Sequence, residues 1–149
     1  MEGVIFVGLQ ASGKSSFFRE RFYTTHIRLN LDMLRTRHRE AILLAACIKA
    51  KQPVVIDNTN PTIAERTKYI VAFKQAQFKV VGFYFQSKLN ICLSRNRQRQ
   101  GKARIPDAGI RGTYNRLNIP DVNEGFDELY YVSLINNQFI VRNWKQNEL

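Results

Sequence analysis

The sequence predicts an α/β fold in which a mainly parallel sheet of about five strands lies between layers of helices. Two observations predict this fold. Short apolar runs alternate with stretches of helical periodicity along the whole chain, and alternation at this spacing is typical of parallel sheets with helical crossovers. The length of 149 residues suits a single domain that spans 1–149.

The expected strands are short apolar runs. The first, Val4-Ile5-Phe6-Val7, is apolar at every position, as in a strand that is buried on both faces. Pro53 fits the start of the strand over 54–56, and Asn136-Asn137 fits the turn of a hairpin. In chain order, the expected strands cover 4–7, 27–30, 54–56, 78–85, 129–135 and 139–144.

The expected helices follow from residue spacing and from caps. Phe18 and Phe22 stand four residues apart, and apolar residues recur at helical spacing between 34 and 48. Asn60-Pro61 fits an N-cap and a first helical residue, while Thr62 with Glu65 is an alternative capping box. The expected helices cover 13–22, 34–48, a stretch that begins at Asn60-Pro61, 89 to about 99, and a stretch from Pro106 to Ile119-Pro120.

The charge balance indicates an anionic partner. The chain has 23 Lys and Arg against 12 Asp and Glu, a net charge of +11, which fits nucleic acid, phosphate ligands or an acidic membrane face. The longest nearly pure apolar run, Ala41 to Ile48, is too short to cross a membrane. Cys47 and Cys92 lie in apolar surroundings without metal-binding spacing, so we expect reduced thiols and a cytoplasmic protein.

Residues Gly8 to Ser15 match the phosphate-loop pattern G-x-x-x-x-G-K-[ST] in full, between a buried strand and a helix. The glycines let the backbone turn toward phosphate oxygens, and the amides of residues 11–15 are expected to point at a β-phosphate. Lys14 reaches the β- and γ-oxygens, and the Ser15 hydroxyl is placed to bind Mg²⁺. The expected nucleotide-binding residues are Gly8, Gln10, Ala11, Ser12, Gly13, Lys14, Ser15 and Ser16.

A phosphate loop predicts nucleoside triphosphate binding but leaves the reaction open. The N-K-x-D pattern by which GTPases read guanine does not occur in the sequence, and the chain is far shorter than a motor ATPase. A kinase-type phosphotransferase fits best, so the chain should also carry residues that bind and activate an acceptor.

Asp32 follows the second expected strand, at the sheet edge where ligands lie in open parallel sheets. Its carboxylate is suited to accept the proton of an attacking hydroxyl, as kinases require. An N-cap of the helix over 34–48 fits the same position equally well. Arg35 comes one helical turn later and can hold a substrate anion in the same cleft.

Asp57 ends the apolar run over 54–56, as an acid does in Walker-B segments. We expect it near Ser15, where it orients Mg²⁺ or the waters of the ion. Thr59 and Asn60 are expected to face the same cleft, although a turn and a helix cap are at least as good an interpretation of Asn60.

A basic run over 95–104 contains five cations and no acid. Such a run fits a solvated helix end, or a lid over about 95–106 whose arginines close over a γ-phosphate. Arg95 and Arg99 stand four residues apart and share a helix face. Arg97 points elsewhere and is expected to be solvated.

Four motifs then stand in the order and at the spacing of one family: Gly8–Ser15, Asp32-x-x-Arg35, Val55–Asn60 and Arg95-Asn96-x-x-Arg99. The chain resembles the 5′-hydroxyl polynucleotide kinase branch of the P-loop phosphotransferases. It is similar in particular to the kinase module of polynucleotide kinase/phosphatases and to small stand-alone bacterial ATP-binding relatives. The resemblance covers nearly the whole chain and implies a three-layer P-loop kinase sandwich with a short basic lid.

The resemblance also implies ATP and Mg²⁺ as cofactors, and a 5′ end of DNA or RNA as the acceptor. On the donor side it implies that Lys14 and Ser15 bind phosphate and Mg²⁺, and that Asp57 supports the metal. On the acceptor side it implies that Asp32 is the general base and that Arg35 with Thr59 holds the 3′ phosphate of the acceptor. It also implies that Arg99 with Arg95 stabilises the transferring phosphoryl group.

One departure keeps other acceptors open. Leu31 and Met33 flank Asp32, where many polynucleotide kinases carry polar or acidic residues. A kinase of a nucleotide-sized or other small hydroxyl substrate is therefore the second hypothesis. The third is an ATP-binding switch or a nucleic-acid-binding module without phosphotransfer. No feature of the sequence indicates the oligomeric state.

Overall fold

The computed structural model of the protein describes residues 1–145. Its centre is a six-stranded sheet in the order β2-β3-β1-β4-β5-β6, in which only β6 runs antiparallel to its neighbour. The strands are β1 (Glu2–Val7), β2 (Ile27–Leu29), β3 (Val54–Ile56), β4 (Lys79–Phe85), β5 (Glu128–Ile135) and β6 (Gln138–Asn143). The predicted α/β class and mainly parallel sheet are confirmed, with six strands rather than about five.

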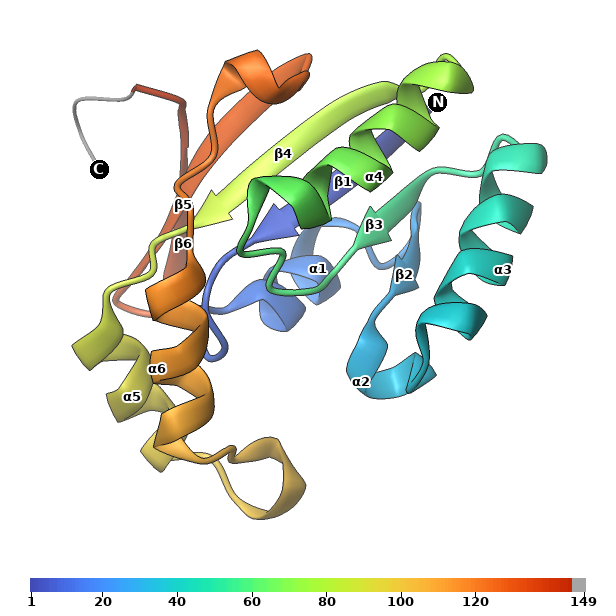
Figure 1. The fold of residues 1–149 in the computed structure, drawn as a ribbon. Coiled ribbons are helices and arrows are strands. Elements are labelled where there is room, and N and C mark those ends of the chain that lie inside the picture. The colour runs from blue at the N-terminus through green and yellow to red at the C-terminus, as the bar shows by residue number, and fades with distance from the viewer. Residues whose placement is uncertain (146–149) are drawn as a thin grey trace.

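Helices cover both faces of the sheet, with α4 in front of it and α1 behind it in Figure 1. They are α1 (Lys14–Arg21), α2 (Leu31–Leu34), α3 (Arg37–Lys49), α4 (Ile63–Gln75), α5 (Leu89–Arg97) and α6 (Asp107–Arg116), with the short 3-10 helices η1 (Gly101–Ala103) and η2 (Val122–Glu124). No helix within residues 1–145 is long and apolar enough to cross a membrane.

Strand β1 explains why the core has two halves. Its side chains alternate between the faces, so Ile5 and Val7 join the α3 and α4 side, whereas Val4 and Phe6 join the α1 side. All four are fully buried. The uninterrupted apolar run in the sequence is therefore the mark of a central parallel strand.

The helix expected over 34–48 begins later, at Arg37, and a separate short helix, α2, precedes it, which corrects the sequence prediction. Arg35 adopts a φ of 74° and ends the short helix α2, and α3 starts anew at Arg37. Each helix has its own cap: the Asn30 side chain accepts the Met33 N–H, and the Thr36 hydroxyl accepts the Arg39 N–H. Two good caps six residues apart favour two helices over one.

The helix after β3 starts later than Asn60-Pro61. Thr62 caps α4 in a reciprocal capping box with Glu65, as the alternative interpretation predicted. Asn60 lies in the left-handed region with φ 45° and is buried. It therefore shapes the turn before the helix instead of capping it.

Candidate active site

The expected functional segments follow successive strands of the parallel sheet. The phosphate loop follows β1, Asp32 follows β2, Asp57 follows β3, and the connection from α5 to α6 comes after β4. Because these strands are parallel neighbours, their carboxyl ends share one edge of the sheet. In Figure 1 this edge faces α2, α5 and α6.

The phosphate loop is a tight turn that leads into α1. The Gly8 N–H donates to the backbone oxygen of Thr59, with 3.0 Å between N and O, so the loop is tied to the segment after β3. Gly13 precedes α1 with φ 103°, no side chain caps the helix, and its first turn holds no acid. An uncapped N-terminus of this kind suits a phosphate, because free amides and the helix dipole both favour an anion.

Lys14 is held inside this loop. Only 8% of its surface is exposed, and its ammonium donates to the backbone oxygens of Gly8 and Leu9 at 2.9 and 2.6 Å. Burial lowers the pKa of Lys14 to about 8, because a low-dielectric surrounding disfavours the charged form. The ammonium is thus already desolvated at the position where phosphate oxygens would bind.

The charged groups around Lys14 are those that the sequence predicted for the site. Beyond the main effect of burial, Asp57 and Asp32 raise the pKa of Lys14, whereas Arg99 lowers it. All three side chains therefore lie within electrostatic reach of the ammonium. The fold thus brings side chains from three other segments of the chain close to one cation.

Ser15 and Asp57 form the expected oxygen pair. The Ser15 hydroxyl donates to Asp57 Oδ2 over 3.3 Å, and the Asp57 side chain is 1% exposed. Hydroxyl and carboxylate oxygens are suitable ligands for Mg²⁺, which takes few protein ligands when nucleotide phosphates supply the others. Within residues 1–145, no group of three His, Cys, Asp or Glu is placed to hold a metal ion.

Arg28 is a member of the site that the sequence analysis missed. Its Nε donates to Asp57 Oδ2 at 2.7 Å and its Nη2 to Ser15 Oγ at 2.8 Å. The guanidinium therefore neutralises the buried carboxylate and also contacts the proposed metal ligand. In the sequence, Arg28 appears only as a cation inside the short expected strand over 27–30. That position does not indicate which residue its guanidinium contacts.

Asp32 is exposed in the first turn of α2. It caps neither helix, since Asn30 caps α2 and Thr36 caps α3, so the cap interpretation is wrong. Among the residues that the structure describes, none forms a hydrogen bond or an ion pair with its carboxylate. A solvent-accessible, uncommitted carboxylate beside the phosphate loop is free to act on a ligand.

A buried network fixes the start of α2. Asn30 donates to the backbone oxygen of Asp57 at 2.6 Å. The Asn58 side chain accepts a hydrogen bond from the Leu31 N–H at 2.9 Å and donates one to Glu40 at 2.9 Å. The Glu40 side chain is almost fully buried and also accepts a hydrogen bond from the Tyr69 hydroxyl at 2.7 Å. Burial, together with this hydrogen bond, raises the pKa of Tyr69. The loops after β2 and β3 are thus locked to each other.

The other acceptor-side residues have different environments. Arg35 is exposed and has an unusual positive φ, a strain that often marks functional positions. Thr59 is half-buried, and its backbone supports Gly8. Asn60 does not face the cleft as expected, because it is buried and its amide donates to the Phe6 carbonyl at 2.8 Å.

The run expected to form a lid, 95–106, covers the last turn of α5, η1 and the residues up to the start of α6. Arg95 is half-buried and donates to the Ala11 carbonyl over 3.5 Å, so it already lies against the phosphate loop. Arg99 is exposed and donates to the Ala103 carbonyl, at 3.4 Å.

Two further side chains fix the structure of this segment. The buried Asn96 side chain forms two hydrogen bonds with the Ile105 backbone, at 2.6 and 3.1 Å, and so ties the end of α5 to the residues before α6. Arg97 is exposed as expected, and it pairs with Asp107 at 3.5 Å.

Most of the positive charge lies on two segments. Six arginines against two acids stand within 19–39, a net +4, and six basic residues against one acid stand within 95–111, a net +5. Together they carry nine of the eleven net positive charges. In Figure 1, the connection between α5 and α6 lies on the side of the carboxyl ends of the strands, whereas the arginines of 19–39 are spread over α1, β2, the residue after α2 and the start of α3.

Comparisons with known proteins agree with this geometry. Residues 4–117 match the model of the AAA domain family. A bifunctional polynucleotide phosphatase/kinase of Schizosaccharomyces pombe is 30% identical over 129 residues, covering 84% of this chain and 32% of that protein. An L-seryl-tRNA(Sec) kinase of Methanococcus maripaludis is 25% identical over 143 residues, covering 83% of this chain and 55% of that protein. The chain thus spans about a third and about half of the lengths of these relatives.

A solved structure supports the fold. A gluconokinase from Sinorhizobium meliloti matches with a TM-score of 0.64 and 16% identity, covering 89% of this chain and 82% of that chain. At this identity the likeness extends to the P-loop kinase fold alone.

Proposed function

The chain belongs to the AAA domain family, and from that premise we propose that it transfers the γ-phosphate of ATP to the 5′-hydroxyl of DNA or RNA. The observation that carries the proposal is the position of Asp32. Its exposed carboxylate lies within electrostatic reach of the buried Lys14, so a base for the acceptor hydroxyl stands beside the site for the donor phosphates.

On the donor side, the α1 N-terminus and the Lys14 ammonium hold the β- and γ-phosphates. Ser15 and Asp57, whose side-chain oxygens lie 3.3 Å apart, would hold a magnesium ion between them and the phosphates. Such an ion would supply positive charge next to the phosphate oxygens.

On the acceptor side, Asp32 accepts the proton of the 5′-hydroxyl. The hydroxyl oxygen forms a bond to the γ-phosphorus, and the bond from that phosphorus to the β,γ-bridging oxygen breaks. ADP leaves with the electron pair of that bond, and the product is a 5′-phosphate monoester. Arg95 and Arg99 neutralise the charge on the transferring group, while Arg35, with Thr59, holds the 3′ phosphate of the acceptor.

Two observations favour nucleic acid over a small acceptor. The net positive charge gathers on segments 19–39 and 95–111, beyond what the donor phosphates need. Both curated relatives also bear names of kinases that act on nucleic acids, a polynucleotide in one and an aminoacylated tRNA in the other.

The test is transfer of labelled γ-phosphate to three acceptors: a 5′-hydroxyl oligonucleotide, a nucleoside 3′-monophosphate and a free nucleoside. We expect product with the first two and little with the third. Equal transfer to the free nucleoside would favour a small-molecule kinase. Binding of ATP without transfer to any acceptor would favour a switch.

Asp32→Asn separates catalysis from donor binding. We expect turnover to fall by about 10²–10⁴, the usual contribution of a general base, while the Kd for ATP stays within about twofold. Asp121→Asn, in an acid of the η2 cap far along the chain, is the control for loss of one negative charge. Unchanged turnover in Asp32→Asn would overturn the assignment of the base.

A further inference from the structure

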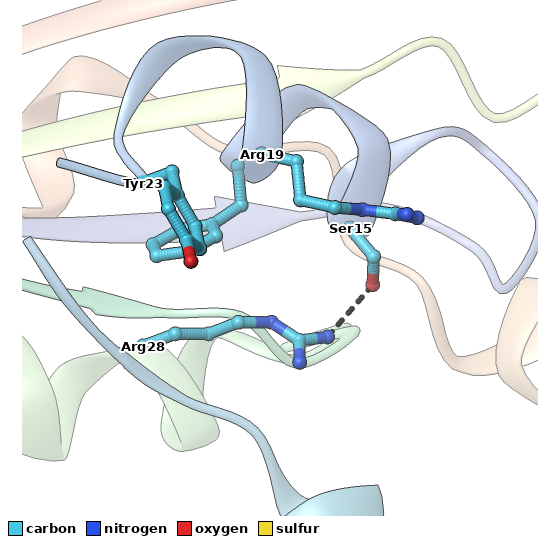
Figure 2. Close-up of a pocket in the computed structure, with 5 residues that line it drawn as sticks. Ser15, Arg19, Tyr23 and Arg28 are labelled. Atoms are coloured by element: carbon cyan, nitrogen blue, oxygen red, sulfur yellow. Dashed lines mark hydrogen bonds between the residues drawn. The ribbon is translucent and has the colours of Figure 1, made fainter.

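A cavity of about 260 Å³ lies between α1 and the edge strand β2. Its lining residues are Ser15, Phe18, Arg19, Tyr23 and Arg28, and we call it the α1–β2 cavity. In Figure 2, Ser15 and Arg19 extend from α1 on one side, Arg28 extends from β2 on the other, and the Tyr23 ring stands at the far end. At this size, just below the roughly 300–1,000 Å³ typical of ligand pockets, it suits a single nucleobase with its attached phosphate.

The lining is cationic and aromatic, and it contains no acid. Arg19 is exposed and forms no ion pair with any residue that the structure describes. Tyr23 is 72% exposed, so its ring is accessible to a ligand. Cations beside an exposed ring are the combination by which proteins hold single-stranded nucleic acid, since phosphates meet the cations and bases stack on the rings.

The cavity joins the proposed active site directly. Arg28 lines it while donating to both Ser15 and Asp57, and its guanidinium lies 6.0 Å from the centre of the buried Phe18 ring. Arg28 also stands on the strand that leads to α2 and Asp32. A ligand in the cavity would therefore lie next to the site of phosphoryl transfer without filling it.

We propose that the α1–β2 cavity binds one nucleotide of the acceptor strand other than the nucleotide that carries the reacting hydroxyl, with its base on Tyr23 and its phosphate on Arg19. This inference rests on the proposed function, because it makes the acceptor a strand of at least two nucleotides. It adds a binding subsite that lies apart from Asp32 and Arg35.

The test compares two acceptors, a 5′-hydroxyl hexanucleotide and a nucleoside 3′-monophosphate. In Tyr23→Ala and in Arg19→Gln we expect kcat/KM for the hexanucleotide to fall by about tenfold, the loss typical of one base–ring stack or phosphate contact. We expect the value for the mononucleotide to stay within about twofold. Arg21→Gln is the matched control, since Arg21 is exposed on the same helix, lies over the Phe17 ring and does not line the cavity.

Three results would overturn the inference: an unchanged value for the hexanucleotide, an equal fall for both acceptors, or an equal fall in Arg21→Gln. If the unmodified protein phosphorylates neither acceptor, the proposed function is wrong, and that result alone does not test the cavity. The cavity is then tested by fluorescence anisotropy of a 3′-labelled hexanucleotide. We expect Tyr23→Ala, but not Arg21→Gln, to weaken binding, and no binding by the unmodified protein would overturn the inference as well.

Discussion

The side-chain oxygen of Asn58 accepts a hydrogen bond from the Leu31 backbone N–H, and the two atoms lie 2.9 Å apart. Leu31 is the first residue of α2, so a residue that follows β3 fixes where the helix of Asp32 begins. Asn58 in turn donates to the buried Glu40. The position of the proposed base therefore depends on a side chain from another strand end.

Asn58→Ala should separate this positioning role from donor binding. The change leaves the Leu31 N–H without its acceptor and removes a donor from Glu40, so we expect a loss of about 1–3 kcal/mol in the free energy of unfolding. We also expect kcat to fall while the Kd for ATP is unchanged. Asn118→Ala, at an exposed position, is the control. Unfolding in urea gives the first quantity, and a variant with full kcat would show that Asn58 does not position Asp32.

Lys14 should make both stability and ATP binding depend on pH. Its pKa in the folded protein is lowered to about 8 from 10.5, so between these values the unfolded chain binds more protons and the free energy of unfolding should rise with pH. ATP affinity should move the other way, because the cationic form binds phosphate and is lost above pH 8. The affinity should fall by up to about tenfold per pH unit.

Lys14→Met is the comparison for both trends, since it keeps the stem of the side chain but cannot titrate. Unfolding free energies of the two proteins, each without nucleotide, are measured at pH 8 and pH 10. The difference between the two proteins should change with pH. A constant difference would mean that Lys14 keeps its ordinary pKa in the folded state.

The ion pair of Arg66 and Glu124 should be worth far more than a surface pair. Arg66 is fully buried, binds both Glu124 oxygens at 2.8 and 3.0 Å, and donates to two backbone oxygens in the turn before α4. Removal of Arg66 leaves the Glu124 carboxylate buried without its cation, so Arg66→Met should lower the free energy of unfolding by about 3–5 kcal/mol. Lys74→Gln, which breaks an exposed pair with Asp127 at 3.6 Å, should cost about 0–1 kcal/mol. Urea unfolding of both variants decides the comparison, and similar losses would contradict it.

Arg35 should contribute to acceptor binding although its backbone conformation is strained. Its φ of 74° and ψ of −33° cost a non-glycine residue about 1–3 kcal/mol. Arg35→Gly should therefore leave the free energy of unfolding within about 1 kcal/mol of its original value, because relief of strain offsets the extra freedom of the unfolded chain. Arg35→Ala keeps the strain. Both variants should raise KM for a nucleoside 3′-monophosphate, and an unchanged KM in both would remove Arg35 from the acceptor site.

The placements that the structure confirms are local. The phosphate loop is a contiguous pattern that leads into α1, and Asp57 directly follows an apolar run that forms the buried strand β3. The alternative cap at Thr62 and Glu65 was also visible, because a capping box spans four residues. Each of these depends on neighbours in the chain.

The parts that the sequence missed are long-range or ambiguous. Arg28 meets Asp57 across 29 positions, and Glu40 looks like an ordinary surface acid of an amphipathic helix although it is buried. The end of α2 before Arg35 was hidden because Leu34 fits the apolar spacing of the helix that follows. Only the three-dimensional arrangement of β2 and β3 reveals these partners.

Strand β2 has the weakest attachment of the parallel strands that surround the site. It spans three residues at the edge of the sheet and, within residues 1–145, pairs with β3 alone, so its local opening should need less free energy than that of β1. The chain that carries Arg28, Asn30 and Asp32 is thus the part most open to stabilisation by a ligand. The amide hydrogens of Ile27–Leu29 should exchange quickly in the free protein, and their exchange should slow markedly when nucleotide binds. Hydrogen exchange at this edge of the sheet should therefore report how much of the protein has nucleotide bound.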